Sequence, residues 1–151
     1  MPVTDKQAAT LHAYLAGRTE EHDRLYAELT REEVGYEFSA LLAAAVFEAI
    51  GRRFIKGEEI ASDQDVVKFV ADLRSRTSAT AAVLDPTVAE RLICHSLGRG
   101  DVDDIDDKTV FGAQFILLAG LIVDEEFTED ELESFIATAR SIADDWIARD
   151  R

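Results

Sequence analysis

The longest apolar stretch of the chain covers residues 110–123, which contain no charged side chain and a single amide, Gln114. Its fourteen residues are too few for a helix that spans a membrane, which needs about 20, and too many for a typical strand of about five or six. The length therefore favours a buried helix. Asp106 or Asp107 is placed to cap its N-terminus, and the acidic residues 124–126 end it. Because the stretch is apolar on all sides, we expect packing partners on every face.

A second strongly apolar segment covers residues 34–54 and follows a potential capping box formed by Thr30 and Glu33. Basic residues gather at its C-terminal end, where a positive charge is favoured by the helix dipole. We expect this segment to be a long helix that packs directly on 110–123. The two glycines of 110–123 would let a second helix approach closely.

Five amphipathic helices are predicted elsewhere, from apolar residues that recur at helical spacing. Each follows a residue that can cap a helix N-terminus, namely Thr4, Thr19, Ser62, Asp85 and Thr128. Residues 57–61 and 77–80 are interpreted as linkers. No segment alternates between apolar and polar residues as a half-buried strand would, and no Asn-Gly or Asp-Gly hairpin signal occurs. The sequence thus predicts an all-α fold, with six or seven helices in a compact bundle around 34–54 and 110–123, as a single helical domain over residues 1–151.

The charge of the chain is strongly negative and unevenly distributed. The net charge is −15, and residues 101–133 contribute −11 of it through twelve acidic residues and one lysine. Such a charge disfavours binding to nucleic acid and to anionic membrane surfaces. The acidic residues form two clusters, one before and one after the helix predicted at 110–123. The chain has one cysteine and its first residues lack the pattern of a signal peptide, so we expect a soluble, cytoplasmic protein.

The acidic loop before 110–123 is the weak candidate for a metal site. The ligand spacing of an EF-hand calcium loop is absent from it, and no histidine of the chain follows a glutamate at the spacing of a ferritin-like di-iron site. We therefore expect no cofactor and no dedicated metal centre. Weak binding of a divalent cation is the alternative, with its ligands drawn from Asp101, Asp103, Asp104, Asp106 and Asp107.

No residue pattern points to catalysis. Cys94 and His95 are adjacent, and adjacent residues of a helix point about 100° apart, so they cannot act together as nucleophile and base. Cys94 has apolar neighbours and is interpreted as a buried, inert thiol. A basic patch for phosphate or an acidic partner would require two helix ends to meet; helix-dipole complementarity explains the same residues, which are Arg52, Arg53, Lys56, Arg74 and Arg76.

The sequence favours a non-catalytic, acidic helical module that binds a protein partner, with a basic partner as the natural match for its charge. The residues expected to bind this partner lie in the two acidic clusters and are Asp103, Asp104, Asp124, Glu125, Glu126, Glu129 and Asp130. One alternative is a small-molecule binder or enzyme with an apolar pocket between the two central helices, whose polar groups would be Tyr36, Glu48 and Gln114. The other alternative is a structural homo-oligomer, most simply a homo-dimer, whose apolar helices complete a shared core.

Overall fold

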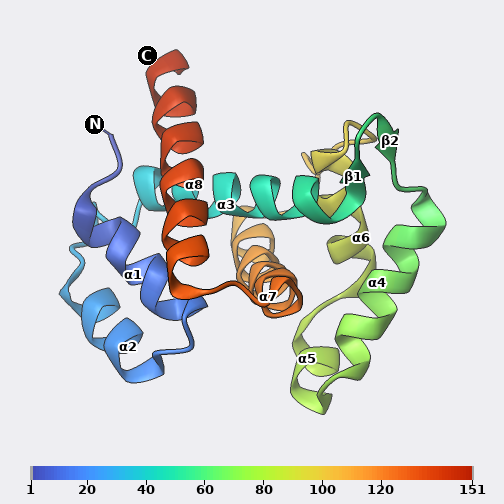
Figure 1. Ribbon diagram of the computed structural model, residues 1–151, viewed down its shortest axis with the longest axis horizontal. Coiled ribbons are helices and arrows are strands. Elements are labelled where there is room, and N and C mark those ends of the chain that lie inside the picture. The colour runs from blue at the N-terminus through green and yellow to red at the C-terminus, as the bar shows by residue number, and fades with distance from the viewer. Residues whose placement is uncertain (1, 151) are drawn as a thin grey trace. The chain divides into compact units, whose positions relative to one another are not determined.

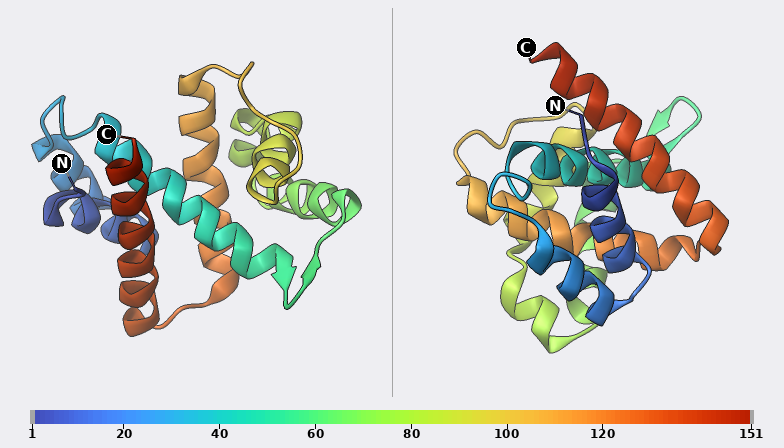
Figure 2. Two further views of the ribbon diagram at one scale, coloured as in Figure 1. Left: turned by 90° about the horizontal axis from the view of Figure 1, so that it is seen from above. Right: turned by 90° about the vertical axis from the view of Figure 1, so that its left-hand side faces the viewer.

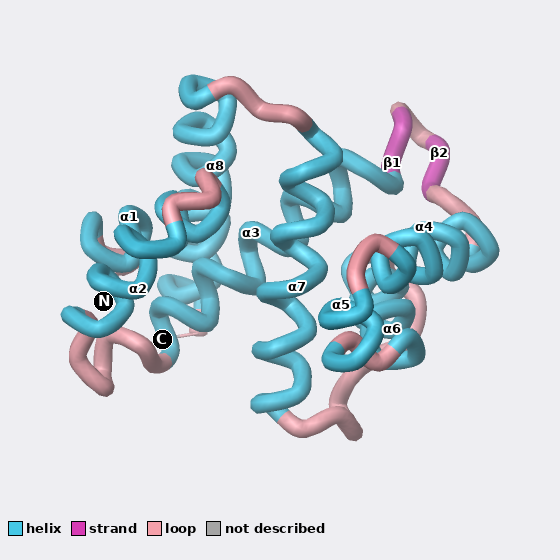
Figure 3. Tube along the Cα trace, turned by 90° about the horizontal axis from the view of Figure 1, so that it is seen from below, coloured by secondary structure: helices cyan, strands magenta, loops and turns pink. Residues whose placement is uncertain are grey.

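The computed structural model describes residues 2–150, and helices dominate its backbone (Figure 1; Figure 3). The described residues form eight helices and one small hairpin, so the all-α fold class is confirmed. Within the described residues, no helix combines the length and the apolar character needed to cross a membrane.

The backbone divides into two compact units, unit 1 from residues 1–48 and 125–151 and unit 2 from residues 49–124. Helix α3 begins in unit 1 and ends in unit 2. The helices of unit 1 are α1 (Asp5–Leu15), α2 (Thr19–Glu28), most of α3 (Tyr36–Phe54) and α8 (Glu129–Arg149). The elements of unit 2 are the end of α3, β1 (Ile55–Lys56), β2 (Glu59–Ile60), α4 (Asp63–Ser75), α5 (Ser78–Val83), α6 (Pro86–Ser96) and α7 (Asp107–Glu125).

Helices α1 and α8 pack side by side in unit 1 (Figure 1; Figure 2). Both begin at the predicted capping boxes, at Thr4 and at Thr128, where the hydroxyl and the side chain three residues later satisfy backbone N–H groups in both directions. Arg140 of α8 donates hydrogen bonds to the Asp5 carboxylate at 2.8 Å and to the Val3 carbonyl at 2.7 Å. These contacts hold the start of α1 against α8. The core of unit 1 is built from buried aliphatic and aromatic residues that include Leu11, Phe38, Leu41, Leu42, Leu132 and Phe135.

Two predicted helix starts in unit 1 are wrong by a few residues. Thr19 is the first residue of α2 and not its cap, because Arg18 occupies the cap position and makes no capping hydrogen bond. The capping box of Thr30 and Glu33 does form, with hydrogen bonds of 2.9 and 3.1 Å, but it closes a turn instead of opening α3. Gly35 has a low helix propensity and follows this turn directly, and the continuous helix begins only after it.

Most of unit 2 follows the predicted capping signals. Ser62 caps α4, Asp85 caps α6 with Pro86 in the first helical position, and Gly98 ends α6 with a φ of +84°. The buried face of α4 consists of the predicted residues, which are Val66, Phe69, Val70 and Leu73. These agreements show that local capping chemistry decides where these helices begin and end.

Two short elements of unit 2 were not predicted. Residues 77–80 are not a linker, because Thr77 caps helix α5 there. This helix buries none of its residues, so its sequence shows no apolar stripe. The connector at 57–61 contains a hairpin that pairs Ile55 with Ile60, and Gly57 takes the positive φ of +63° that its two-residue turn requires. Strands of two residues are too short to show alternation.

Helix α7 contains the predicted apolar stretch, and Asp106 caps it by accepting a 3.2 Å hydrogen bond from the Thr109 N–H group. Leu117 and Leu118 have no exposed surface. The expectation that every face of this helix is covered is nevertheless wrong, because Val123 is 69% exposed and several other positions are half-buried. Coverage of α7 is therefore incomplete, and it is greatest between Leu117 and Ile122.

Gly120 of α7 allows the close helix approach that was expected. A Cβ atom at this position would lie 2.5 Å from Cδ1 of Leu73 on α4, so the absence of a side chain is what seats Leu73 there. Gly112 is different, since a Cβ atom on it would meet nothing within 4 Å. One of the two glycines is thus a packing site for α4.

We predict that Leu117→Ala lowers the free energy of unfolding by about 2–5 kcal/mol, because the truncation leaves a cavity in a fully covered position. Leu25→Ala in α2 removes a half-buried side chain and should cost less than about 1.5 kcal/mol. Urea denaturation of both variants measures the two losses. Similar, small losses in both variants would show that α7 is not a core helix.

Candidate functional site

The two acidic clusters predicted as one partner surface lie at opposite ends of α7. This helix has 19 residues, which corresponds to about 28 Å at 1.5 Å per residue. The loop at 101–107 precedes its first turn, and Asp124 and Glu125 lie in its last turn. The clusters therefore have to be considered separately.

Two carboxylates of the loop at 101–107 accept hydrogen bonds from other residues of unit 2. Arg91 of α6 donates to both carboxylate oxygens of Asp104, one of them at 3.0 Å, and also to the backbone carbonyl of Asp101 at 2.8 Å. The Arg91 hydrogen bond is the main reason that the pKa of Asp104 is lowered. Hydrogen bonds from the side chain and backbone of Thr109 likewise lower the pKa of Asp106. Both carboxylates thus stay ionised in structural roles.

The loop does not gather its aspartates around a common point. Asp103 and Asp107 are exposed, while Asp101 accepts a hydrogen bond from the Asp103 N–H group at 3.3 Å in a local turn. In the described part of the chain, the one group of three metal-ligating side chains whose ligand atoms lie within 4.8 Å of one another is found elsewhere, in unit 1. Weak cation binding by the loop aspartates stays a prediction without geometric support.

Asp124, at the end of α7, is bound by two arginines. Its carboxylate accepts hydrogen bonds from Arg53 of α3 at 3.0 Å and from Arg76 at the end of α4 at 2.9 Å. Partial burial acts to raise the pKa of Asp124, but the hydrogen bonds and charges of Arg76 and Arg53 outweigh it, and the pKa is lowered. Arg53 also lies over the ring of Phe69, 5.0 Å from its centre.

This arrangement contradicts the predicted basic patch. Arg53 and Arg76 do meet, yet they meet around a carboxylate, and Arg76 binds Asp72 as well, at 2.8 Å. Arg74 does not join them: it donates to the carbonyl groups of Ala81 in α5 and of its C-cap residue Leu84. The five basic residues therefore do not form one open anion site.

The acidic cluster at the start of α8 is more open. Glu126 adopts a left-handed backbone with a φ of +52° in the turn before α8, and it is exposed, as is Asp130. Glu129 is 49% exposed and receives two basic side chains: Nε2 of His12 lies 3.0 Å from its Oε1, and Nη2 of Arg18 lies 3.5 Å from its Oε2. Arg18 also lies 3.7 Å from Glu21 of α2.

His12 is the functional candidate that sequence reasoning missed. Together with Glu129 and Glu133 it forms the group of three potential ligands in unit 1. The spacing of the two glutamates, four residues apart, places them on one face of α8, and this signal is visible in the sequence. The histidine comes from a helix more than 100 residues away in the chain. Only the packing of α1 on α8 brings it to the pair.

Cys94 is half-buried, and the expectation of a fully buried thiol is wrong. It lines a groove of about 540 Å³ in unit 2, and its Sγ lies 3.8 Å from Oδ1 of Asp63. Burial is the main cause that raises the pKa of this thiol. His95 does not assist it, since its Nδ1 lies 3.1 Å from the carbonyl oxygen of Gly100. The protonated, less reactive thiol is favoured in the native protein.

The polar residues of the alternative pocket are exposed or half-buried on their helices. Tyr36 is 53% exposed, and its hydroxyl donates to the carboxylate of Asp150 at the end of α8. It lines a shallow groove of about 340 Å³ in unit 1 with Trp146. Glu48 lies half-buried on α3, and Gln114 lies half-buried on α7. The small-molecule pocket with these three groups stays a hypothesis.

We predict that Cys94 reacts with a maleimide more slowly in the folded protein than in urea at the same pH, because burial disfavours the thiolate. Mass spectrometry of samples quenched over time measures both rates. Equal rates in the two conditions would contradict the assignment of an inert thiol.

We predict that Asp124→Asn lowers the free energy of unfolding by about 1–2 kcal/mol at neutral pH, since it removes the acceptor of two partly exposed arginines. The pKa of Asp124 is lowered in the folded state, so its contribution is complete above the pKa of an unfolded aspartate and is lost as the pH falls through the lowered value. The difference in stability between the wild type and the variant should therefore shrink in acid.

Asp145→Asn is the matched control, because Asp145 pairs with Arg149 on the exposed surface of α8 and should contribute less than about 0.5 kcal/mol. Urea denaturation between neutral and acidic pH measures all three proteins. If the difference for Asp124→Asn stays constant down to the most acidic pH, the cluster of Asp124, Arg53 and Arg76 does not stabilise the fold as argued.

The described side chains thus offer an open acidic cluster with a nearby histidine in unit 1, and a groove with a free thiol in unit 2. Both arise from packing between helices, and neither carries the spacing of an established sequence motif. No protein-family model, no curated protein and no solved structure matches this chain.

Proposed function

We propose that the chain is a non-catalytic, acidic interaction module that binds a basic protein segment through the first turns of α2 and α8 and the turn that precedes α8. We name this surface the acidic edge and define it by Glu20, Glu21, Glu126, Glu129 and Asp130. The proposal keeps Glu126, Glu129 and Asp130 of the sequence prediction. It leaves out Asp104 and Asp124, because arginines within unit 2 already bind them. It also leaves out Asp103, which lies in the loop of unit 2, and Glu125, which ends α7.

The charge of unit 1 supports this location. Unit 1 holds 18 acidic and 7 basic residues, a net charge of −11, whereas unit 2 holds 13 acidic and 9 basic residues, a net charge of −4. A surface of one sign attracts and orients a partner of the opposite sign, and it does so more strongly at low salt. The unit with the larger charge is thus the better candidate for the partner site.

The geometry around Arg18 supports a continuous edge. Its guanidinium lies within 3.7 Å of Glu21 on α2 and within 3.5 Å of Glu129 on α8, so the first turns of these two helices are neighbours. Carboxylates in a first helical turn are stabilised by the helix dipole. In the described part of the chain, the side chains of Glu126 and Asp130 take part in no hydrogen bond or ion pair, which leaves both available to a partner.

The direction of the pKa shifts disfavours one catalytic role, that of a general acid, for three of the aspartates. The pKa values of Asp104, Asp106 and Asp124 are all lowered by hydrogen bonds and neighbouring cations. A general acid needs the opposite shift, which keeps a carboxyl group protonated near neutral pH. The free cysteine is in keeping with a reducing compartment, so we place the module in the cytoplasm.

The test uses a Lys/Arg-rich helical peptide as the probe and the isotope-labelled full chain. Amide chemical shifts should change mainly at the acidic edge when the peptide is added. The double variant Glu126→Gln/Asp130→Asn should weaken binding by about tenfold, since each neutralised rim charge contributes up to about 1 kcal/mol. Fluorescence anisotropy of the labelled peptide measures this affinity.

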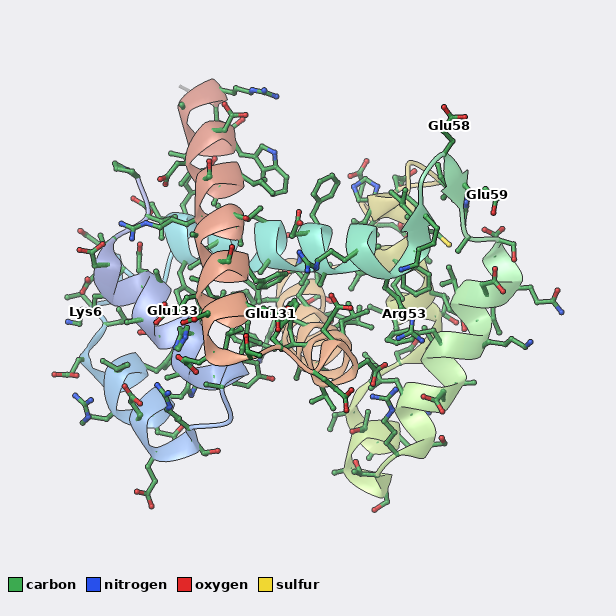
Figure 4. All side chains as sticks on the ribbon, viewed as in Figure 1. Lys6, Arg53, Glu58, Glu59, Glu131 and Glu133 are labelled. Atoms are coloured by element: carbon green, nitrogen blue, oxygen red, sulfur yellow. The ribbon has the colours of Figure 1, made fainter. Side chains whose placement is uncertain are left out.

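The matched control is Glu58→Gln/Asp103→Asn, which removes the same charge from exposed positions of unit 2. Glu58 lies at the tip of the hairpin (Figure 4), and Asp103 lies in the loop of the other acidic cluster. This control should bind the peptide like the wild type. The proposal is contradicted if the amide chemical shifts change across both units or if both double variants weaken peptide binding equally. Either result would show that the peptide responds to net charge and not to the acidic edge.

A further inference from the structure

We propose that His12, Glu129 and Glu133 bind one divalent transition-metal ion of the zinc class. These three residues come from α1 and α8 of unit 1, and each offers one ligand atom within 4.8 Å of the others. The proposal does not rest on the interaction module, although Glu129 belongs both to the acidic edge and to this group of ligands.

The placement of the two glutamates follows from helix geometry. Residues four apart lie on one face of a helix, so Glu129 and Glu133 present their carboxylates together, while Asp130 points about 100° away from Glu129. Figure 4 shows Glu133 on α8 beside α1. Glu133 is exposed and Glu129 half-exposed, so both side chains can adjust to an ion.

The third ligand is held in place by packing. His12 is only 16% exposed at its side chain, and it sits between Leu11 and Ala13, which are both buried. The backbone N–H group of Val3 donates to Asp144 of α8 at 2.7 Å, and Arg140 of α8 binds the start of α1. Metal sites built on two packed helices need this kind of fixed ligand, because it lowers the entropy lost on binding.

The ring nitrogen of His12 that faces the glutamates lacks a well-directed partner. Its Nε2 is inaccessible to solvent and lies 3.0 Å from Oε1 of Glu129, yet this contact does not have the geometry of a hydrogen bond. A buried polar atom without a hydrogen bond is costly. An ion would satisfy it, since two ligand atoms at about 2.0–2.1 Å from a tetrahedral zinc ion are about 3.3 Å apart, close to the distance observed here.

The donor set selects the class of ion. An imidazole nitrogen suits zinc and other first-row transition metals, whereas magnesium prefers six oxygen ligands. Three protein ligands leave one position of a tetrahedral ion for water. Arg18 lies 3.5 Å from Oε2 of Glu129, the oxygen that does not face His12, so Oε1 remains the ligand atom.

Titration calorimetry of the full chain with zinc chloride tests the proposal, with magnesium chloride at matched ionic strength as the reference. We expect one equivalent of zinc to bind and to raise the melting temperature, and magnesium to do neither. Glu133→Gln and His12→Gln should each weaken zinc binding by at least about tenfold. Glu133 is exposed, so we expect Glu133→Gln to keep the fold. If His12→Gln unfolds the protein, zinc binding by Glu133→Gln alone tests the proposal.

Asp130→Asn and His95→Gln are the controls, an exposed carboxylate of the same helical turn and an exposed histidine of unit 2. Both should bind zinc like the wild type. The proposal is overturned if the wild type binds no zinc, if magnesium stabilises it equally, or if the controls lose as much affinity as the ligand variants. Loss of zinc binding in Glu133→Gln with unchanged peptide binding would separate this site from the acidic edge.

Discussion

Three helix C-termini meet near the carboxylate of Asp124, and the two arginines at this point make the meeting possible. Asp124 lies in the last turn of α7, where the helix dipole opposes a negative charge. Arg53 comes from the last turn of α3 and Arg76 from the end of α4, so each guanidinium is favoured by its own helix as well as by Asp124. Without these arginines, the most apolar helix of the chain would end with an unpaired, half-buried carboxylate at the negative end of its own dipole. The cluster thus links the ends of α3, α4 and α7.

The same principle of charge placement explains why the acidic residues differ so much in their availability. The helix dipole opposes a negative charge at a helix C-terminus, and Asp124 is bound by arginines there. Asp104, in the loop before α7, is bound by Arg91. A carboxylate in the first turn of a helix is stabilised by the backbone itself, and Asp130 needs no cation there. Local backbone geometry thus determines which carboxylates remain open to partners, and total charge alone does not.

Elements defined by local chemistry could be predicted from the sequence, and those defined by tertiary contacts could not. The caps at Thr4, Ser62, Asp85 and Thr128 depend on residues within four positions of each other, and each was predicted. Helix α5 has a cap but no buried face, and the hairpin has strands too short for a pattern. His12 has no unusual neighbours in the sequence. Its approach to Glu129 depends on the angle between two helices, which no local pattern encodes.

The side chain of Leu73 occupies the space that a side chain at position 120 would need, so these two positions share one volume. Each can change only within limits set by the other: a side chain at position 120 requires a smaller residue at position 73, and a larger residue at 73 requires that 120 stay glycine. In a lineage of such proteins, the order of substitutions would matter, with the loss of bulk on α4 preceding any gain on α7. The contact therefore couples the two positions, and they should covary although they lie 47 positions apart in the sequence.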